Sequence, residues 1–382
     1  MDIDHVHFYI KEGNDWENWF VKTLNCHAIA HHQTAQTNTT ILKNGAVYFL
    51  ISTPTAPDSP IAHYLQRHPD GVADIAFRVS HLKTTLTRFT HQGGTVVRSP
   101  QSYQGTQETL RWAVVQGWGD LCHTLVERTI NESSHKRSQN VPTLMPLPDG
   151  GVQEFLLIPH SAIAPSPHSK YAFTGIDHVV LNVEQGKLSE AIAQYEQRFG
   201  FERGQEFRIQ TRRSALASQV LSHPDGSAQL PMNEPASPTS QIQEFLTANR
   251  GAGVQHLALQ TPDILSTIAH LRHLGMTFLR VPPTYYQQLR YRRHPPLPEA
   301  FFQAIAAQEV LVDWQIENPK ALLLQAFSHP IFDQPTFFFE LIERQFYLDD
   351  HQLRQVKGFG EGNFQALFEA VEQEQIKRGN LE

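Results

Sequence analysis

The sequence predicts an α+β fold made of two similar halves, each containing two strand–helix–strands units. Two observations support this prediction. Four short segments of one kind recur along the chain, at residues 3–10, 71–79, 175–183 and 253–261, and each has the composition of a strand followed by a helix pattern. The two halves of the chain also match each other at many positions, which indicates a duplication.

The first and third segments, IDHVHFYI and GIDHVVLNV, open the two halves and share the run Ile-Asp-His-Val at residues 3–6 and 176–179. Large apolar residues follow each segment at the spacing of a helix face. These residues are Trp16, Trp19 and Phe20 in the first half, and Leu188, Ile192, Tyr195 and Phe199 in the second. We therefore expect a strand and then a helix at the start of each half.

The second and fourth segments align without a gap, from Gly71 matched to Gly253 onward. The match continues through a helix pattern into residues 93–103 and 275–285, where glycine, threonine, arginine, proline and tyrosine fall at equivalent positions. We therefore predict a helix followed by a strand in both places, with the strands over residues 93–103 and 275–285.

The closing strands match as well, TLVERT at residues 124–129 with ELIERQ at residues 340–345. Between the halves, residues 131–170 are rich in serine, proline and histidine, which predicts a connector with one short strand, GVQEFLLI, inside it. We place the domain boundary in this connector. The N-terminal domain is then residues 1–160 and the C-terminal domain is residues 161–382.

Composition limits the classes of function. The chain has 382 residues, of which 40% are hydrophobic, and a net charge of −7, which argues against a nucleic-acid or anionic-membrane partner. Its two cysteines, Cys26 and Cys122, form no disulfide framework and fit a reducing cytosol. The sequence contains no apolar run long enough to span a membrane, and its start lacks a signal-peptide pattern. We expect a cytoplasmic globular protein.

The strand FFFELIERQ at residues 337–345 contains a carboxylate, Glu340, between apolar neighbours. Side chains alternate along a strand, and both faces are apolar here, so the strand is predicted to be buried on both sides. An unpaired charge is costly in such a place, so something must neutralise Glu340. Glu343 is different, because Glu127 matches it in the other half, and we predict a structural role for it.

Three polar positions stand out in the aligned halves, and two of them differ between the halves. The second half has His178, His256 and Glu340 where the first half has His5, Asp74 and Thr124. Two histidines and one carboxylate on different strands, with coordination positions left open, form the ligand set of a non-haem Fe(II) oxygenase. Zn²⁺ accepts the same ligands, so ligand type does not fix the metal. The structural alternative is hydrogen-bonded core histidines and a glutamate paired with an arginine. The first half lacks the third ligand and is predicted to hold no metal.

With these features the chain resembles the vicinal oxygen chelate superfamily, in which strand–helix–strands units pair into open barrels. The second half is similar, nearly end to end, to the 4-hydroxyphenylpyruvate dioxygenase family, and the first half resembles that family's more divergent N-terminal domain. The matching stretches are GIDHVVLNV, LPMNEP, SQIQEFL, GAGVQHLAL, PPTYY, LLLQAF, FFFELIER and KGFGEGNFQALFEAVEQEQ. The resemblance implies two tandem open β-barrel domains built from paired βαβββ modules, with a C-terminal lid helix.

The family pattern also implies roles for individual residues. His178, His256 and Glu340 resemble the ligands of one Fe(II) ion per chain. Phe327 and Phe364 resemble the aromatic pair that holds the substrate ring, and neutral amides and aromatic faces suit a phenol and a keto acid. The substrate-binding residues that the resemblance implies are Ser218, Asn233, Gln241, Gln255, Gln325, Phe327, Phe338, Phe359, Asn363 and Phe364.

The C-terminal segment predicts a helix after a glycine-rich loop, GFGEGN, at residues 358–363. We expect Asn363 to cap this helix, whose apolar stripe includes Phe364, Leu367, Phe368 and Val371. The resemblance adds that the helix closes over the pocket and excludes water.

The resemblance implies conversion of 4-hydroxyphenylpyruvate and O₂ to homogentisate and CO₂, by oxidative decarboxylation, ring hydroxylation and side-chain migration. It further implies a homodimer or homotetramer, and a place in tyrosine catabolism or in tocopherol and plastoquinone biosynthesis. Three alternatives stay open: a 4-hydroxymandelate synthase acting on the same substrate, an extradiol-type ring-cleaving dioxygenase, and a non-catalytic protein that binds small molecules. Phe327 and Pro231 favour the homogentisate-forming reaction over mandelate formation.

Overall fold

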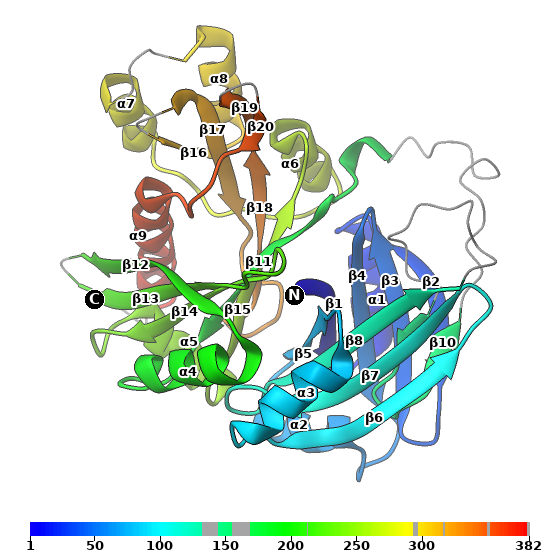
Figure 1. The fold of residues 1–382 in the computed structure, drawn as a ribbon. Helices are drawn as coiled ribbons and strands as arrows, with labels where there is room; N and C mark the ends of the chain where they lie inside the picture. Colours follow the sequence, from blue (N-terminus) through cyan, green and yellow to red (C-terminus); the bar gives the residue numbers. More distant parts are fainter. Residues whose placement is uncertain are drawn as a thin grey trace.

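The computed structural model describes residues 1–131, 144–154, 169–211, 213–292, 297–315, 318–349 and 352–379. Within these ranges the chain forms two eight-stranded sheets with helices packed against them, and each sheet curls into an open half-barrel (Figure 1). The first half-barrel, blue to cyan in Figure 1, lies beside the second, green to red. The predicted α+β fold of two tandem open barrels is confirmed.

In the first half, two βαβββ modules build one sheet with the strand order β2-β3-β4-β1-β5-β8-β7-β6. A short helix, α2, joins the modules, and a small hairpin of β9 and β10 follows them. The elements are β1 (Asp2–Tyr9), α1 (Gly13–Lys22), β2 (His27–Gln33), β3 (Thr37–Asn44), β4 (Val47–Pro54), α2 (Pro60–Arg67), β5 (Gly71–Arg78), α3 (Leu82–His91), β6 (Val96–Gln104), β7 (Glu108–Gln116), β8 (Cys122–Ile130), β9 (Leu144–Pro146) and β10 (Val152–Glu154).

The second half repeats this plan with the strand order β12-β13-β14-β11-β15-β18-β17-β16 and ends in the helix α9. Its elements are the 3₁₀ turn η2 (Ser169–Tyr171), β11 (Gly175–Asn182), α4 (Leu188–Gln194), the π-helical turn η3 (Tyr195–Phe199), β12 (Glu202–Gln210), β13 (Ala215–Ser222), β14 (Gln229–Pro235), α5 (Gln241–Asn249), β15 (Gly253–Gln260), α6 (Ile264–His273), α7 (Pro283–Arg292), α8 (Glu299–Ala307), β16 (Leu311–Gln315), β17 (Asn318–Phe327), β18 (Phe338–Arg344), β19 (Phe346–Asp349), β20 (Gln352–Gln355) and α9 (Glu361–Lys377).

The two sheets agree in strand direction and in register. In the first half β1 runs parallel to β4 and antiparallel to β5, which runs parallel to β8, and the corresponding strands of the second half pair in the same way. His5 lies opposite Ala76 and His178 lies opposite Ala258, so the predicted superposition of these strands is confirmed. Of the predicted connector strand, Val152–Glu154 forms β10 and Gly151 precedes it, while residues 155–158 and the domain boundary after residue 160 lie outside the described residues.

One predicted strand is wrong. Residues 93–103 lead into β6, as expected, but residues 277–282 form only an isolated bridge, and the helix α7 begins at Pro283. Pro282 and Pro283 lack the N–H donors that a strand ladder needs, and proline at the first helical position has its φ already set for a helix. The true counterpart of β6 is β16, at the edge of the sheet, so α7 and α8 are an insertion in the second half.

Two glutamates hold equivalent helices in place. Glu343 accepts a hydrogen bond of 2.8 Å from the backbone N–H of Ile264 at the start of α6, and Glu127 accepts one of 2.7 Å from that of Leu82 at the start of α3. A carboxylate stabilises a helix N-terminus through its unpaired N–H groups and dipole. The structural role predicted for Glu343 is confirmed.

The two half-barrels are closed by different elements. In the first half Leu144 and Met145 of β9, and Leu147 directly after it, pack among buried apolar residues such as Leu50 and Trp112, so side chains fill that interior. In the second half α9 contacts both edge strands, β12 and β16, and closes the open side as a helix. The helix starts at Glu361, after Gly360 in a left-handed conformation, so the prediction that Asn363 caps it is wrong.

The halves share one hydrophobic core, to which the first helix of each half contributes. Trp19 on α1 stacks on Phe339 of β18, with ring centroids 6.3 Å apart. In return, Tyr195 and Phe199 of η3 reach the first half, where the Tyr195 hydroxyl lies 2.7 Å from His123 Nε2. Each half thus covers a central strand of the other with its own helix. Among the described residues, no helix is long and apolar enough to cross a membrane.

We predict that Phe339→Ala lowers the free energy of unfolding by about 3–5 kcal/mol, because it removes a fully buried ring from this shared core. Chemical denaturation followed by tryptophan fluorescence measures the change. The control is Leu353→Ala, since the Leu353 side chain is 67% exposed, and it should shift the value by less than about 0.5 kcal/mol. Equal effects of the two variants would contradict a shared core at Phe339.

Candidate metal centre and cavity

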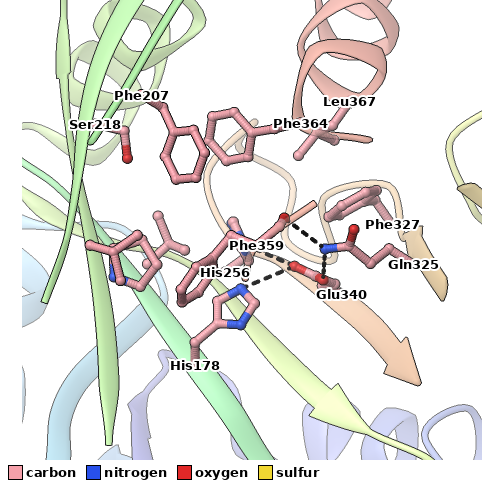
Figure 2. A pocket seen from close by; sticks show the side chains of 13 residues that line it. His178, Phe207, Ser218, His256, Gln325, Phe327, Glu340, Phe359, Phe364 and Leu367 are labelled. Carbon is pink, nitrogen blue, oxygen red and sulfur yellow. Dashed lines mark hydrogen bonds and ion pairs between the residues drawn. The ribbon is translucent and has the colours of Figure 1, made fainter. Parts of the chain in front are cut away.

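Three buried side chains meet on the central strands of the second half-barrel. Glu340 Oε2 of β18 lies 3.2 Å from His178 Nε2 of β11 and 3.4 Å from His256 Nε2 of β15 (Figure 2). Their ligand atoms all lie within 4.8 Å of one another, and the described residues contain no second group of this kind. The sequence pattern therefore pointed to side chains that the fold brings together, and their role as metal ligands stays a prediction.

Both histidines sit beside β-bulges that aim them. The register of β11 against β15 skips Asp177 in one place and Gln255 in the other. A bulge leaves its extra residue outside the ladder and turns the strand locally, so that side chain can reach the neighbouring histidine. Asp177 Oδ1 lies 2.8 Å from His178 Nδ1, and Gln255 Oε1 lies 3.2 Å from His256 Nδ1. With both Nδ1 atoms held, both Nε2 atoms face Glu340.

A buried arginine fixes the first of these contacts. Arg344 donates from Nε to Asp177 Oδ2 at 2.6 Å and from Nη2 to Asp177 Oδ1 at 2.7 Å. Its Nη1 donates to the carbonyl of Gly358 at 2.7 Å, in the loop before α9. Sequence reasoning missed Asp177 and Arg344 as parts of the site, although both recur in the first half as Asp4 and Arg128.

The first half keeps this support and one histidine, His5, but it has Asp74 and Thr124 in place of the other two ligand candidates. Arg128 Nη2 lies 2.8 Å from Asp4 Oδ1, which lies 2.9 Å from His5 Nδ1, as at the corresponding place in the second half. Asp74, however, accepts hydrogen bonds from the hydroxyl and the backbone N–H of Thr124, at 2.7 and 3.0 Å. Its carboxylate is therefore engaged within the protein, which agrees with a supporting role for this half.

The charges of the cluster are strongly coupled. Burial alone would lower the pKa of His178, but the charge of Glu340 and hydrogen bonds to Asp177 and Glu340 raise it to about 9. Burial alone would raise the pKa of Glu340, but the charge of His178 and hydrogen bonds from both histidines lower it to about 2. Burial lowers the pKa of His256. Without metal, the proton therefore sits on His178 and the carboxylate is ionised.

The donor set fits a divalent metal ion. Once His178 loses its proton, the site offers two neutral imidazole nitrogens and one carboxylate oxygen, all converging in a place with almost no exposure to solvent. A bound cation would neutralise the one remaining charge of Glu340. Gln325 Nε2 donates to Glu340 Oε1 at 2.8 Å, which leaves Oε2 as the oxygen that faces both histidines (Figure 2). Such a set accepts Fe(II) or Zn²⁺.

A narrow cavity opens on this cluster. Five of the ten predicted substrate-binding residues line it, namely Ser218, Gln325, Phe327, Phe359 and Phe364. The residues that line it besides these and the three ligand candidates are Val180, Phe207, Val220, Pro231 and Leu367. Apart from His178, His256 and Glu340, the lining contains no ionisable side chain, so its polarity comes from the Ser218 hydroxyl and the Gln325 amide (Figure 2).

The other five predicted substrate residues do not line this cavity. Phe338 stacks on His256 with ring centroids 4.7 Å apart. Gln255 holds the same histidine, as described above. Asn363 donates to Gln325 Oε1 at 2.8 Å, and Gln241 is buried in the first turn of α5. Direct contact of these residues with a substrate therefore stays a prediction, as does that of Asn233.

Three neighbouring strands carry polar groups whose hydrogen-bonding capacity is unused. Ser218, Asn233 and Asn182 lie side by side across β13, β14 and β11. Asn233 Nδ2 donates to Asn182 Oδ1 at 3.2 Å, but Ser218 Oγ, Asn233 Oδ1 and Asn182 Nδ2 have no partner among the described residues. Buried polar atoms without partners are rare and suit a ligand. Sequence reasoning missed Asn182, although it follows His178 and Val180 at the spacing of one strand face.

Both halves of the chain match models of known protein families. Residues 175–302 match the family model of the glyoxalase/bleomycin resistance protein/dioxygenase superfamily, and residues 1–137 match the model of the N-terminal part of hydroxyphenylpyruvate dioxygenase. A solved mutant of 4-hydroxymandelate synthase from Streptomyces coelicolor is similar with a TM-score of 0.77 and 25% identity, over 98% of each chain.

Full-length relatives are similar as well. The 4-hydroxyphenylpyruvate dioxygenases of Yarrowia lipolytica and Caenorhabditis briggsae are 32% and 33% identical to the chain, and each match covers 99% of this chain and 93% of the relative. That of Aspergillus fumigatus is 31% identical over the same shares. With this identity along its whole length, the chain belongs to the 4-hydroxyphenylpyruvate dioxygenase family and is a dioxygenase of that type.

Proposed function

We propose that this chain converts 4-hydroxyphenylpyruvate and O₂ to homogentisate and CO₂. The observation that carries the proposal is the cluster of His178, His256 and Glu340 at the end of a cavity with aromatic walls and no other charge. Relatives named for this reaction match the chain along its whole length. The proposed product, homogentisate, would then be an intermediate of tyrosine breakdown or a precursor of tocopherol and plastoquinone.

We assign one Fe(II) ion per chain to His178, His256 and Glu340. When bound there, Fe(II) would supply the redox chemistry that activates O₂. The chain's own contribution is orientation: the Nδ1 contacts fix both imidazoles, and Gln325 fixes the carboxylate. Partners that orient metal ligands in this way usually matter for affinity and activity.

The cavity walls support an aromatic substrate. The Phe207 and Phe364 rings stack with centroids 5.7 Å apart, and Phe327 and Phe359 complete an apolar wall around the open space. Such walls bind an aryl ring and keep water out, while the Gln325 amide and the Ser218 hydroxyl offer hydrogen bonds without competing for the metal. No lining residue other than the cluster could act as a general base, so the proposed reaction relies on the metal and on positioning.

A second candidate function is 4-hydroxymandelate synthesis, which the similarity to the Streptomyces coelicolor protein favours. Both reactions use one substrate and one ligand set, and they differ in which carbon is hydroxylated. Phe327 and Pro231 line the cavity as bulky, rigid groups, and the resemblance to the dioxygenase family favours homogentisate where they occur. We therefore rank ring hydroxylation above side-chain hydroxylation.

The product decides between these reactions. Protein loaded with Fe(II) without oxygen, then given 4-hydroxyphenylpyruvate and O₂, should release homogentisate and CO₂ in equal amounts, as measured by mass spectrometry. Mandelate in place of homogentisate would contradict the first proposal and support the second. Activity on a catechol, with none on the keto acid, would favour an extradiol enzyme.

Metal content tests the ligand assignment. We expect about one iron per chain in the Fe(II)-loaded protein, and Glu340→Ala should lower metal affinity by more than about 100-fold and abolish turnover. Elemental analysis and product assays measure both. The matched control is Thr124→Ala at the equivalent position of the first half, which should keep iron and activity. A fully active Glu340→Ala protein, or two irons per chain, would contradict the assignment.

Metal binding should depend on pH in one direction. In the metal-free protein His178 keeps a proton on its ring up to a pKa of about 9, and a metal must displace that proton from Nε2. The affinity for Co(II), a stable probe, should therefore rise by roughly tenfold per pH unit between about pH 7 and 8.5 and level off above about pH 9. Glu340 is ionised throughout and adds no slope. Absorbance titrations that give the same affinity at both ends of this range would contradict the pairing of His178 with Glu340.

A further inference from the structure

A line of hydrogen bonds runs from α7 through the start of α9 to Glu340. The Tyr285 hydroxyl donates to Asn363 Oδ1 at 3.1 Å, Asn363 Nδ2 donates to Gln325 Oε1 at 2.8 Å, and Gln325 Nε2 donates to Glu340 Oε1 at 2.8 Å. The Asn363, Gln325 and Glu340 side chains are at most 3% exposed. Tyr285 lies outside both the cavity lining and the predicted site.

The direction of this line follows from its last member. An ionised carboxylate only accepts hydrogen bonds, so Gln325 must turn its NH₂ group toward Glu340 and its oxygen toward Asn363. Asn363 must then present its NH₂ group to Gln325 and its oxygen to Tyr285. Among the described residues, no group other than the Tyr285 hydroxyl donates to Asn363 Oδ1. The carboxylate therefore sets the orientation of both amides, and the Tyr285 hydroxyl supplies the hydrogen bond that Asn363 Oδ1 accepts.

The backbone of Val312 places the Tyr285 hydroxyl. The Val312 N–H donates to the Tyr285 oxygen at 2.8 Å, which occupies one of its acceptor positions. The hydroxyl proton lies within reach of the Val312 carbonyl and of Asn363 Oδ1, each 3.1 Å from the Tyr285 oxygen. A hydroxyl with this environment is held by β16 while it reaches the first turn of the helix α9 that covers the cavity.

The loop before α9 packs closely against Gln325, a member of this line of hydrogen bonds. Gly360 has a positive φ of 69°, and a Cβ added there would lie 2.4 Å from Gln325 Oε1. Asn363 follows in the first turn of the helix, and Phe364 and Leu367 of that helix line the cavity. The closed position of α9 and the orientation of the Gln325 amide therefore depend on each other.

We propose that Tyr285 is a positioning residue that orients Glu340 through Asn363 and Gln325 and holds α9 closed over the cavity. Because Gln325 occupies Glu340 Oε1, the line leaves Oε2 as the oxygen for the metal. The proposal deepens the proposed function and rests on it, since it assigns the metal to the cluster that Glu340 joins.

The test variant is Tyr285→Phe, which removes one hydroxyl and keeps the ring. We expect its Co(II) affinity to fall about five- to tenfold, its Co(II) visible spectrum to change, and amide hydrogen exchange to speed up in residues 361–371. Its KM should rise by more than its kcat falls, because the open helix weakens the enclosure of the substrate.

The neighbouring residue provides a matched control. The Tyr286 hydroxyl donates to the Val310 carbonyl at 3.2 Å, whereas Asn363 bonds to Tyr285 and Gln325, so Tyr286→Phe loses a similar hydrogen bond outside the line. It should lower thermal stability by a similar amount while keeping the Co(II) affinity, the Co(II) spectrum and the exchange of α9. A double-mutant cycle adds Asn363→Ala, whose effect on Co(II) affinity should be non-additive with that of Tyr285→Phe.

Failure of this proposal and failure of the proposed function give different results. If Glu340→Ala abolishes Co(II) binding while Tyr285→Phe behaves as Tyr286→Phe does, the metal site stands and the role of Tyr285 is wrong. If Glu340→Ala keeps normal Co(II) affinity, the metal assignment itself is wrong and the line serves only the fold. Additive effects of Tyr285→Phe and Asn363→Ala would also overturn the role of Tyr285.

Discussion

A carboxylate buried in the middle of a central strand is the constraint on which the rest of the second half depends. Glu340 is 1% exposed, and an isolated charge in such a place would be expelled or neutralised. The fold meets this constraint by placing His256 on β15 and His178 on β11, the next two strands on one side of β18. Gln325 lies on β17, the neighbouring strand on the other side. In the metal-free protein the proton on His178 balances the charge, and a metal ion can take its place. If the proposed assignment is right, the same three side chains serve stability without the metal and hold it when it is bound.

The two halves share one topology, but the first has a filled interior and the second has a cavity. Both keep a bulged aspartate that joins a histidine to a buried arginine, as Asp4 with Arg128 and Asp177 with Arg344. In the first half, Asp74 is bound by Thr124 and the interior is filled by β9, so the sheet acts as a partner surface for the shared core. In the second half the interior stays open to a cavity, and α9 replaces the filling hairpin with a helix that joins the two sheet edges. Arg344 and Asn363 connect the start of this helix to the two sides of the cluster.

Much of the fold and of the candidate site could be predicted from the sequence, because the duplication allows each strand to be compared with its counterpart in the other half. Glu340 stood out because the first half has Thr124 there, and Glu343 was set aside because Glu127 matches it. The same comparison wrongly predicted a strand after Gly275. The short match between the halves shows no gap there, so it could not reveal the insertion of α7 and α8. Bulges at Asp177 and Gln255 could not be predicted, because they depend on how two strands pair rather than on either strand alone. Asn363 was misplaced as a cap, since its buried partner Gln325 comes from a distant strand.

The most direct test of the metal centre is anomalous diffraction at the iron edge from crystals of the Fe(II)-loaded protein, grown without oxygen. The proposed assignment predicts one strong peak per chain, among His178, His256 and Glu340, and none beside His5 and Asp74. A peak elsewhere, or an ordered cluster of these three side chains without iron, would contradict the account.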